Sequence, residues 1–286
     1  MNIKKKILIF GFGKWSKKII SYLKKNNKFH KIYVKTSSEF FQIYPQKKII
    51  NIDLFRSYLN DLKYIHICTP AESHFRILKL YNLKDKRIII EKPLVTKKNE
   101  LDKIKFFFKS NKIIVNYIDL YNQNLSKIKK KINNKSILHI SLGNQNLFKK
   151  KNDCLNEWLD HPLAIILSLF KKFKRFEIIY YLQKKVKNTY FEEIYLKYTF
   201  QNNFIYIKIN NNYPKVERVI SLKNKSGSID VNLKPKTMTI NSKKNNLNFL
   251  YDDLKNSKKY YFQDFSFHRK IFLEKRKIIK KINEKR

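Results

Sequence analysis

Two of the chain's four glycines, Gly11 and Gly13, are separated by a single residue in the segment KILIFGFGKWSKKI, residues 6–19. Apolar residues from Ile7 to Phe10 precede Gly11, and a lysine-rich segment of helical character follows Gly13. Gly11 permits a tight turn from strand to helix, and Gly13 lets the backbone approach a pyrophosphate near a helix N-terminus. Ser16 stands where a third glycine is common, and it is small enough for close packing of helix on strand. The segment predicts a dinucleotide-binding turn if a βαβ pattern follows it.

Short apolar runs alternate with lysine-decorated helical patterns through the first 120 residues. We expect strands at residues 5–10, 31–35, 63–68, 87–93 and 112–118, and helices at 14–26, 72–83 and 97–110. Strands this apolar, separated by helices, are typical of a parallel sheet that is covered on both faces. The fold class is therefore α/β, with a doubly wound Rossmann domain over residues 1–119.

After residue 120 the pattern changes to strand-like segments joined by short turns. We expect helices at 122–133 and 156–172, a C-terminal amphipathic helix at 265–282, and strands near 136–142, 176–182, 193–200, 203–209, 218–223, 228–233 and 236–240. This predicts an α+β domain over residues 120–286, with a mostly antiparallel, open sheet. Residues 176–182 and 203–209 carry aromatic side chains on both faces, which favours a homo-oligomer, either a dimer or a tetramer.

The formal net charge of +42 first suggests a polyanionic partner. However, the lysines are spread along the whole chain, and Lys, Asn, Ile, Phe and Tyr are all enriched, as an A/T-rich genome would produce. A nucleic-acid footprint would be clustered, so we expect no nucleic-acid partner. Cys68 and Cys154 lack metal-ligand spacing, which predicts no metal site and a reducing, cytoplasmic location. No apolar run approaches the ~18 residues of a membrane span, so no membrane association is expected.

The end of the second expected strand reads KTSS, residues 35–38. An Asp or Glu at this place usually binds the ribose 2′-hydroxyl of NAD. Lys35, Thr36 and Ser37 instead offer a cation and hydroxyls, which suit a 2′-phosphate. NADP is therefore slightly favoured over NAD, with the alternative that Glu39 supplies the carboxylate.

Further motifs follow the glycine turn in order. CTPAESH (68–74) and EKPLV (91–95) each end an expected strand, VNYIDLYNQNLSKIK (115–129) leaves the first domain, and EWLDHPLAIILSLF (157–170) forms a later helix. With GFGKWS (11–16), these segments resemble the glucose–fructose oxidoreductase / inositol dehydrogenase / rhizopine-catabolism (Gfo/Idh/MocA) family. The likeness covers the N-terminal 170 residues well, and the rest only by its strand pattern.

The resemblance implies hydride transfer between a nicotinamide and a hydroxyl or keto carbon of a sugar, nucleotide-sugar or polyol. Lys92 would contact the reacting oxygen and the nicotinamide ribose, and His161 would be the general acid/base. Glu157, four residues before His161, or the adjacent Asp160 would be the partner of the histidine. The resemblance places substrate binding at Tyr117, Asp119 and His161. The expected cofactor-binding residues are Gly11, Phe12, Gly13, Lys14, Trp15, Lys35, Thr36, Ser37, Cys68, Thr69, Pro70, His74, Glu91 and Lys92.

Two other functions compete with a small-molecule oxidoreductase. One is a nucleotide-binding regulator or assembly protein of the same fold without catalysis, and the other is a nucleic-acid-binding protein. Lys92 and His161 occurring together favour the enzyme over the regulator, and the dispersed lysines argue against the third hypothesis.

Overall fold

The computed structural model describes residues 5–144, 153–213, 215–233, 246–256 and 264–285. The chain forms two compact units: Met1–Tyr117 with Met238–His268, and Ile118–Thr237 with Arg269–Arg286. We call them the N unit and the C unit. The N unit thus includes a late segment of the chain, whereas the sequence analysis divides the chain once, after residue 119. Each unit is described by itself below.

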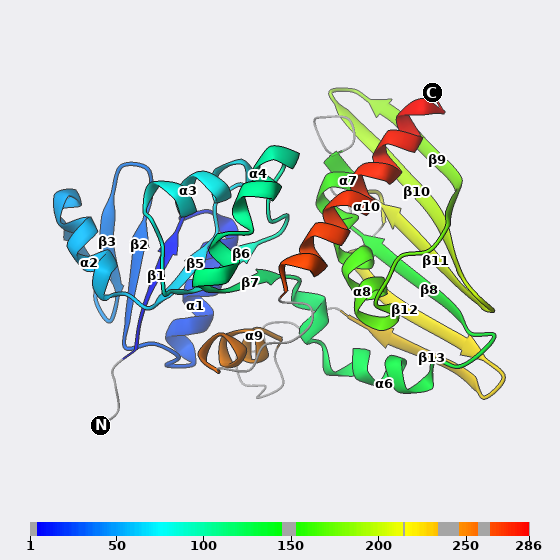
Figure 1. Cartoon of the computed structure of the whole chain (residues 1–286), viewed down its shortest axis with the longest axis horizontal. Helices are drawn as coiled ribbons and strands as arrows, with labels where there is room; N and C mark the ends of the chain where they lie inside the picture. The colour runs from blue at the N-terminus through cyan, green and yellow to red at the C-terminus, as the bar shows by residue number, and fades with distance from the viewer. Residues whose placement is uncertain (1–4, 145–152, 214, 234–245, 257–263, 286) are drawn as a thin grey trace. The chain divides into compact units, whose positions relative to one another are not determined.

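The N unit contains a seven-stranded sheet in the order β4-β3-β2-β1-β5-β6-β7 (Figure 1). Its strands are β1 (Lys6–Phe10), β2 (Lys31–Lys35), β3 (Phe40–Tyr44), β4 (Lys48–Ile50), β5 (Tyr64–Ile67), β6 (Arg87–Glu91) and β7 (Lys112–Asn116). The parallel part of the sheet consists of β2, β1, β5, β6 and β7, as the Rossmann pattern predicts. The antiparallel strands β3 and β4 extend the edge, and the sequence analysis did not predict them.

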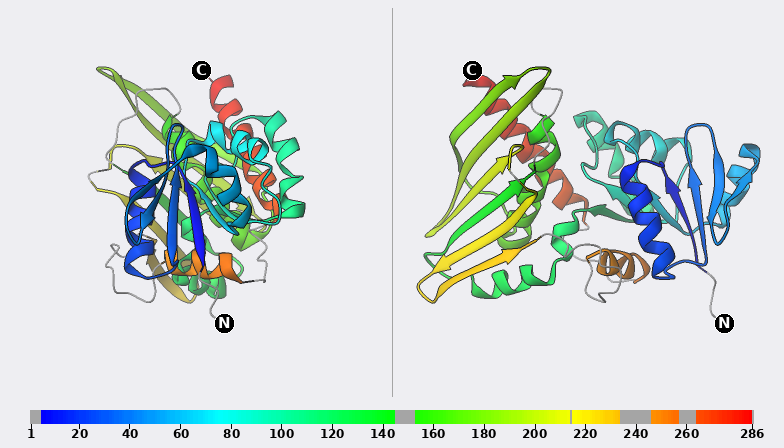
Figure 2. Two further views of the ribbon diagram at one scale, coloured as in Figure 1. Left: turned by 90° about the vertical axis from the view of Figure 1, so that its left-hand side faces the viewer. Right: turned by 180° about the vertical axis from the view of Figure 1, so that it is seen from behind.

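Helices cover both faces of this sheet (Figures 1 and 2). The helical elements of the N unit are α1 (Lys14–Lys25), η1 (Ile52–Leu54), α2 (Phe55–Asp61), η2 (Ala71–Ser73), α3 (His74–Leu80), α4 (Lys98–Ile104), α5 (Phe107–Ser110) and α9 (Asn246–Lys255). Tyr22 of α1 stacks on Tyr251 of α9, so these two helices share one face. On the other face, Phe55 of α2 contacts Tyr81, the residue that ends α3. The core between the layers is made by the strands, with Ile7, Ile9 and Ile89 fully buried.

The C unit contains a six-stranded sheet in the order β13-β12-β8-β11-β10-β9 (Figure 2). Its strands are β8 (Ile137–Gly143), β9 (Phe176–Val186), β10 (Thr189–Phe200), β11 (Asn203–Asn210), β12 (Glu217–Asn224) and β13 (Gly227–Asn232). β8 and β11 are parallel and the other pairs are antiparallel, which confirms the mostly antiparallel sheet. The strand expected at residues 236–240 lies outside the described residues.

One face of this second sheet is covered by helices. The helical elements are η3 (Ile118–Tyr121), α6 (Gln123–Lys131), α7 (Asp153–Trp158), α8 (Asp160–Phe170) and α10 (Phe265–Glu284), whose first residues belong to the N unit. Alternate residues of β10 are buried under them, and Tyr198 donates to Glu274 of α10 over 2.9 Å. The helix expected at 156–172 is divided at Leu159 into α7 and α8, close to Pro162, which has no N–H to donate to Trp158 O.

Across both units, the described residues contain no helix that is long and apolar enough to span a membrane.

Candidate functional site

The glycine turn lies between β1 and α1. Gly11 has a φ of +94°, and a Cβ there would meet Cys68 O at 3.1 Å, so both backbone geometry and space require glycine. At Gly13 a Cβ would meet no described atom within 4 Å, which leaves open space beside the N-terminus of α1. Ser16 is fully buried and donates its hydroxyl proton to Gly13 O over 2.9 Å. These features fit the pyrophosphate of a dinucleotide, which favours helix N-termini that the backbone leaves accessible.

Glu91, at the end of β6, accepts hydrogen bonds from three elements. Its Oε1 atom lies 2.7 Å from Trp15 Nε1, 2.9 Å from His66 Nε2 and 2.9 Å from Asn116 Nδ2. Burial alone would raise the pKa of Glu91, but the hydrogen bonds it accepts, led by that from His66, lower it. Glu91 is therefore a carboxylate that joins the glycine turn to β5 and β7.

His74 connects the loops that follow β5 and β6. Its Nε2 atom lies 2.9 Å from Thr69 O, and its Nδ1 atom lies 3.1 Å from Pro93 O. Burial lowers the pKa of His74, although these carbonyl groups oppose the shift. The Thr69-Pro70 loop and the loop that carries Lys92 are thus held together by a buried imidazole.

The end of β2 carries the residues expected near the ribose. Lys35 is only 6% exposed, and its Nζ atom contacts Thr36 O and lies 3.3 Å from Ser37 O. The Thr36 hydroxyl accepts from Glu39 N over 2.9 Å, which closes the turn into β3.

In the glycine turn, the ring of Phe12 packs on Phe41 of β3. Lys14 is exposed at the start of α1.

His66, Cys68 and Glu91 form the one group in the described chain whose possible metal-ligand atoms lie within 4.8 Å of one another. Burial raises the pKa of the Cys68 thiol well above its usual value, whereas a metal binds the thiolate. Glu91 already accepts three hydrogen bonds, two of them from the indole and amide groups of Trp15 and Asn116. The donor set suits a hydrogen-bond network better than a metal ion.

In the C unit, His161 at the start of α8 is paired with Asp119 of η3. His161 Nδ1 lies 2.7 Å from Asp119 Oδ2, and both side chains are at least 96% buried. Arg218 of β12 donates from Nη1 to Asp119 Oδ1 over 2.9 Å, and its guanidinium lies 5.0 Å from the ring centroid of Trp158. Burial would raise the pKa of Asp119, but the charges of Arg218 and His161 lower it to about 2. Asp119 is therefore ionised at neutral pH.

The carboxylates expected to partner His161 have other positions. Asp160 is buried and accepts from Lys275 of α10 over 2.9 Å, and Glu157 is exposed in α7. Glu157 lies in α7 and His161 in α8, and the carboxylate that lies 2.7 Å from His161 Nδ1 is that of Asp119 in η3. Tyr117, expected near the substrate, is buried in the N unit and stacks on His268 at 5.8 Å.

Several residues that build these sites were not singled out in the sequence analysis: His66, Asn116, Trp158, Arg218 and Tyr251. His66 carries the clearest signal, because a histidine within the apolar strand YIHI needs a polar partner when it is buried. Arg218 gives no such signal, because basic residues are spread along the whole chain.

Comparison with known proteins finds a family model that matches the first part of the chain. Residues 5–117 match the family model GFO_IDH_MocA, described as an oxidoreductase family with an NAD-binding Rossmann fold. No curated protein matches the sequence.

Solved structures share the fold at low sequence identity. A dehydrogenase from Clostridium difficile is 15% identical with a TM-score of 0.72, covering 97% of this chain and 99% of its own. For a UDP-N-acetylglucosamine 3-dehydrogenase from Acidithiobacillus ferrooxidans the identity is 11%, the TM-score is 0.70 and the coverages are 96% and 97%. A myo-inositol dehydrogenase from Lactobacillus casei is 16% identical with a TM-score of 0.60, covering 80% of this chain and 74% of its own. The family match spans the parallel strands and the glycine turn, so residues 5–117 are similar to the Gfo/Idh/MocA oxidoreductase family, whose model describes an NAD-binding Rossmann fold.

Proposed function

We propose that this chain transfers a hydride between a nicotinamide cofactor and a hydroxyl or keto carbon of a sugar, nucleotide-sugar or polyol. The observation that carries the proposal is the buried pair of Asp119 and His161, 2.7 Å apart, in a chain whose residues 5–117 match an NAD-binding family model. Two structural relatives are described as dehydrogenases of a nucleotide-sugar and of a cyclitol, which supports this substrate class.

His161 is the proposed general acid/base. The Asp119 carboxylate favours the tautomer with its proton on Nδ1 of His161, which leaves Nε2 to take a proton from a substrate hydroxyl. In the oxidation direction, the carbinol C–H bond breaks while the hydroxyl proton passes to His161. The bound nicotinamide supplies the acceptor for the hydride. Lys92, at the end of β6, is proposed to stabilise the developing negative charge on the substrate oxygen.

The glycine turn is the proposed site of the cofactor pyrophosphate, because Gly13 opens onto free space at the N-terminus of α1. We propose NADP as the preferred cofactor, because the turn after β2 carries the hydroxyls of Thr36 and Ser37, and the Lys35 cation lies beneath their carbonyl groups, 3.3 Å from Ser37 O. Ser37→Asp, which adds a carboxylate in this exposed turn, should shift the preference towards NADH. Glu39→Gln is the matched test of the alternative, since it would weaken NADH binding if Glu39 contacts the ribose.

We also propose that the chain forms a homo-oligomer through β9. This strand is at the edge of the second sheet, and its Ile179, Tyr180 and Leu182 are between 38% and 50% exposed. An exposed apolar edge strand favours pairing with another chain. Light scattering of the protein and of Leu182→Lys tests this, and a monomer for the unchanged protein would contradict it.

The main experiment is a titration with NADPH and NADH, followed by turnover assays on a panel of sugars, nucleotide-sugars and polyols. His161→Ala, Asp119→Asn and Lys92→Ala should each lower kcat about a hundredfold, the range of general acid/base catalysis. His30→Ala and Lys98→Ala, both exposed, are matched controls that should leave kcat unchanged. Absence of dinucleotide binding would refute the proposal, and binding without turnover of any substrate would favour the regulator.

A further inference from the structure

A continuous chain of hydrogen bonds connects α9 with the start of α1. Tyr251 of α9 has its hydroxyl 2.6 Å from His66 Nδ1, and His66 Nε2 lies 2.9 Å from Glu91 Oε1. Glu91 Oε1 in turn accepts from Trp15 Nε1 over 2.7 Å. The strand register explains this, because β6 and β7 pair Glu91 with Asn116, and β5 and β6 pair His66 with Ile89, two residues before Glu91. His66 and Glu91 therefore point to the same face of the sheet, the face that α1 and α9 cover.

The partners of His66 determine the direction of donation. Burial raises the pKa of the Tyr251 hydroxyl well above its usual value, so this group keeps its proton, and its oxygen lies 2.6 Å from His66 Nδ1. The Glu91 carboxylate can only accept, so the His66 Nε2 atom 2.9 Å away donates the proton of that link. Every link thus has one donor and one acceptor.

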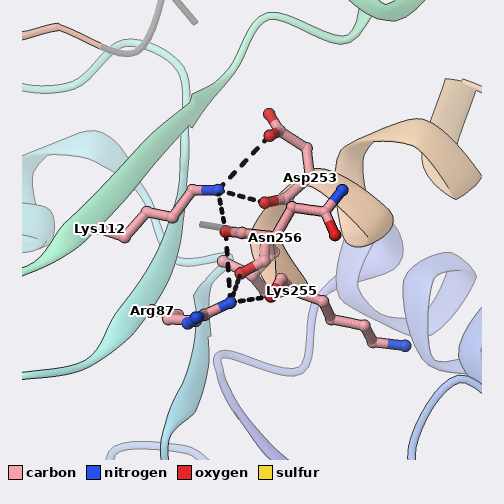
Figure 3. Close-up of polar contacts among 6 residues, drawn as sticks. Arg87, Lys112, Asp253, Lys255 and Asn256 are labelled. Atoms are coloured by element: carbon pink, nitrogen blue, oxygen red, sulfur yellow. Dashed lines mark hydrogen bonds and ion pairs between the residues drawn. The ribbon is translucent and has the colours of Figure 1, made fainter. Parts of the chain in front are cut away.

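The C-terminal end of α9 is fixed to the strands by two cations (Figure 3). Arg87 and Lys112 are the first residues of β6 and β7. Arg87 Nη1 contacts Lys255 O and lies 3.3 Å from Asn256 O. Lys112 Nζ lies 2.7 Å from Asn256 O and also contacts Asp253 O. The last carbonyl groups of a helix have no partner within it and carry partial negative charge, so these cations hold α9 in one position.

We propose that the chain Tyr251–His66–Glu91–Trp15 holds the glycine turn in its cofactor-binding geometry, which makes α9 a positioning element of the cofactor site. Trp15 is the second residue of α1, within the first helical turn, whose N–H groups face the open space beside Gly13. Fixing its side chain fixes the orientation of those N–H groups before the ligand arrives, and such preorganisation strengthens binding. The proposal rests on the proposed function, because it takes this turn as the dinucleotide site.

Trp15→Phe and Tyr251→Phe keep the rings and remove one hydrogen bond each from the chain. Each should weaken binding of NADPH and NADH about five- to tenfold, as the loss of one net hydrogen bond would. Because the two residues act through the same carboxylate, the double variant should bind much more tightly than the product of the single effects predicts. Isothermal titration calorimetry on the full chain measures these affinities without relying on tryptophan emission.

Tyr22→Phe is the matched control. The Tyr22 hydroxyl donates to Asn248, so this variant removes another hydrogen bond between α1 and α9 that does not lead to Glu91. It should lower the melting temperature by a similar amount as Tyr251→Phe but leave the affinity for the dinucleotide unchanged. Equal affinity losses in both variants would show that Tyr251 acts only on stability, which overturns the proposal.

A spectroscopic measurement separates this proposal from the proposed function. In a Trp158→Phe background Trp15 is the remaining tryptophan, and Tyr251→Phe should change its emission and its quenching by acrylamide even without cofactor. An unchanged signal would overturn the proposal even if the protein binds NADPH normally. If the protein binds neither dinucleotide, the proposed function fails, and a changed signal would still show that the chain of hydrogen bonds reaches Trp15.

Discussion

Arg218 determines how strongly the negative charge of Asp119 acts on His161. The guanidinium and the imidazole bind opposite oxygens of the same buried carboxylate, at 2.9 Å and 2.7 Å. Asp160, the other buried acid next to His161 in sequence, is neutralised by Lys275. The guanidinium and the imidazole therefore share one negative charge, and removing the guanidinium strengthens the interaction of Asp119 with the protonated form of His161.

Arg218→Gln should shift the pH dependence of the proposed reaction. Without the guanidinium, Asp119 stabilises the imidazolium form of His161 more strongly, so that form persists to higher pH. The midpoint of the limb of the kcat/KM profile that reports His161 should rise by about one pH unit. Arg175→Gln, at an exposed position of the same unit, is the control, and an unshifted midpoint in Arg218→Gln would contradict this role.

At the residue scale, the site residues that belong to a sequence motif could be predicted. Their hydrogen-bond partners from other elements could not, because only folding brings them close. Gly11, Gly13 and His161 could be named because turn chemistry and an ordered set of motifs pointed to them. The partner of His161 could not, because helical periodicity relates residues within one helix, whereas Asp119 and His161 belong to separate elements. Trp15 was predicted as a cofactor-binding residue of the turn, but its hydrogen bond to Glu91 could not be predicted because it depends on the register of the sheet.

At the element scale, α9 contributes to the stability of the N unit through its charged cap. Arg87→Met removes hydrogen bonds to the last carbonyl groups of the helix, and we expect it to lower the free energy of unfolding by about 1–2 kcal/mol. Denaturant titration of the full chain measures this change. Arg56→Met, exposed in α2, should have little effect, and equal effects of the two substitutions would argue against the cap.

Lys255, the last residue of α9, should make stability depend on pH. Burial first, and then the nearby charges of Lys28 and Lys5, lower the pKa of Lys255 to about 8. Between pH 8 and the unfolded pKa near 10.4, Lys255 is mostly protonated in the unfolded chain and mostly neutral in the folded one. The unfolded chain then binds more protons than the folded chain, so the free energy of unfolding rises with pH in this range. Lys255→Gln should flatten this part of the stability profile between about pH 8 and 10.4. An identical slope in both proteins would contradict the prediction.

Which elements could be predicted depended on the strength of their local pattern. The strands β1, β5 and β6 were predictable because each is a mostly apolar run, and each run is followed by glycine or proline. β3 and β4 were not predicted, since FFQIYPQKKII has a proline between two short segments. α9 was not predicted because its polar residues, among them Asp252 and Asp253, hide an apolar face that only the N unit completes.

At the scale of the whole molecule, the net charge of +42 should affect ligands according to their number of phosphates. A dinucleotide has few phosphates, so its affinity should fall less than about tenfold between 50 and 200 mM salt. RNA held through 6–10 phosphates would lose about 10³–10⁵-fold in the same range. Filter binding with a 30-nucleotide RNA at both salt concentrations checks this, and tight binding of the RNA at 200 mM would instead indicate a nucleic-acid partner.

The return of α9 to the N unit also has a consequence for synthesis of the protein. All seven strands of the first sheet have left the ribosome when Asn116 emerges, but Tyr251 is made only after the described strands of the C unit. At about 5–20 residues per second, this delay is on the order of ten seconds. During that time the nascent N unit exposes the apolar surface that α9 later covers, with His66 open to water. The order of translation would therefore make the proposed cofactor site one of the last parts of the protein to be completed.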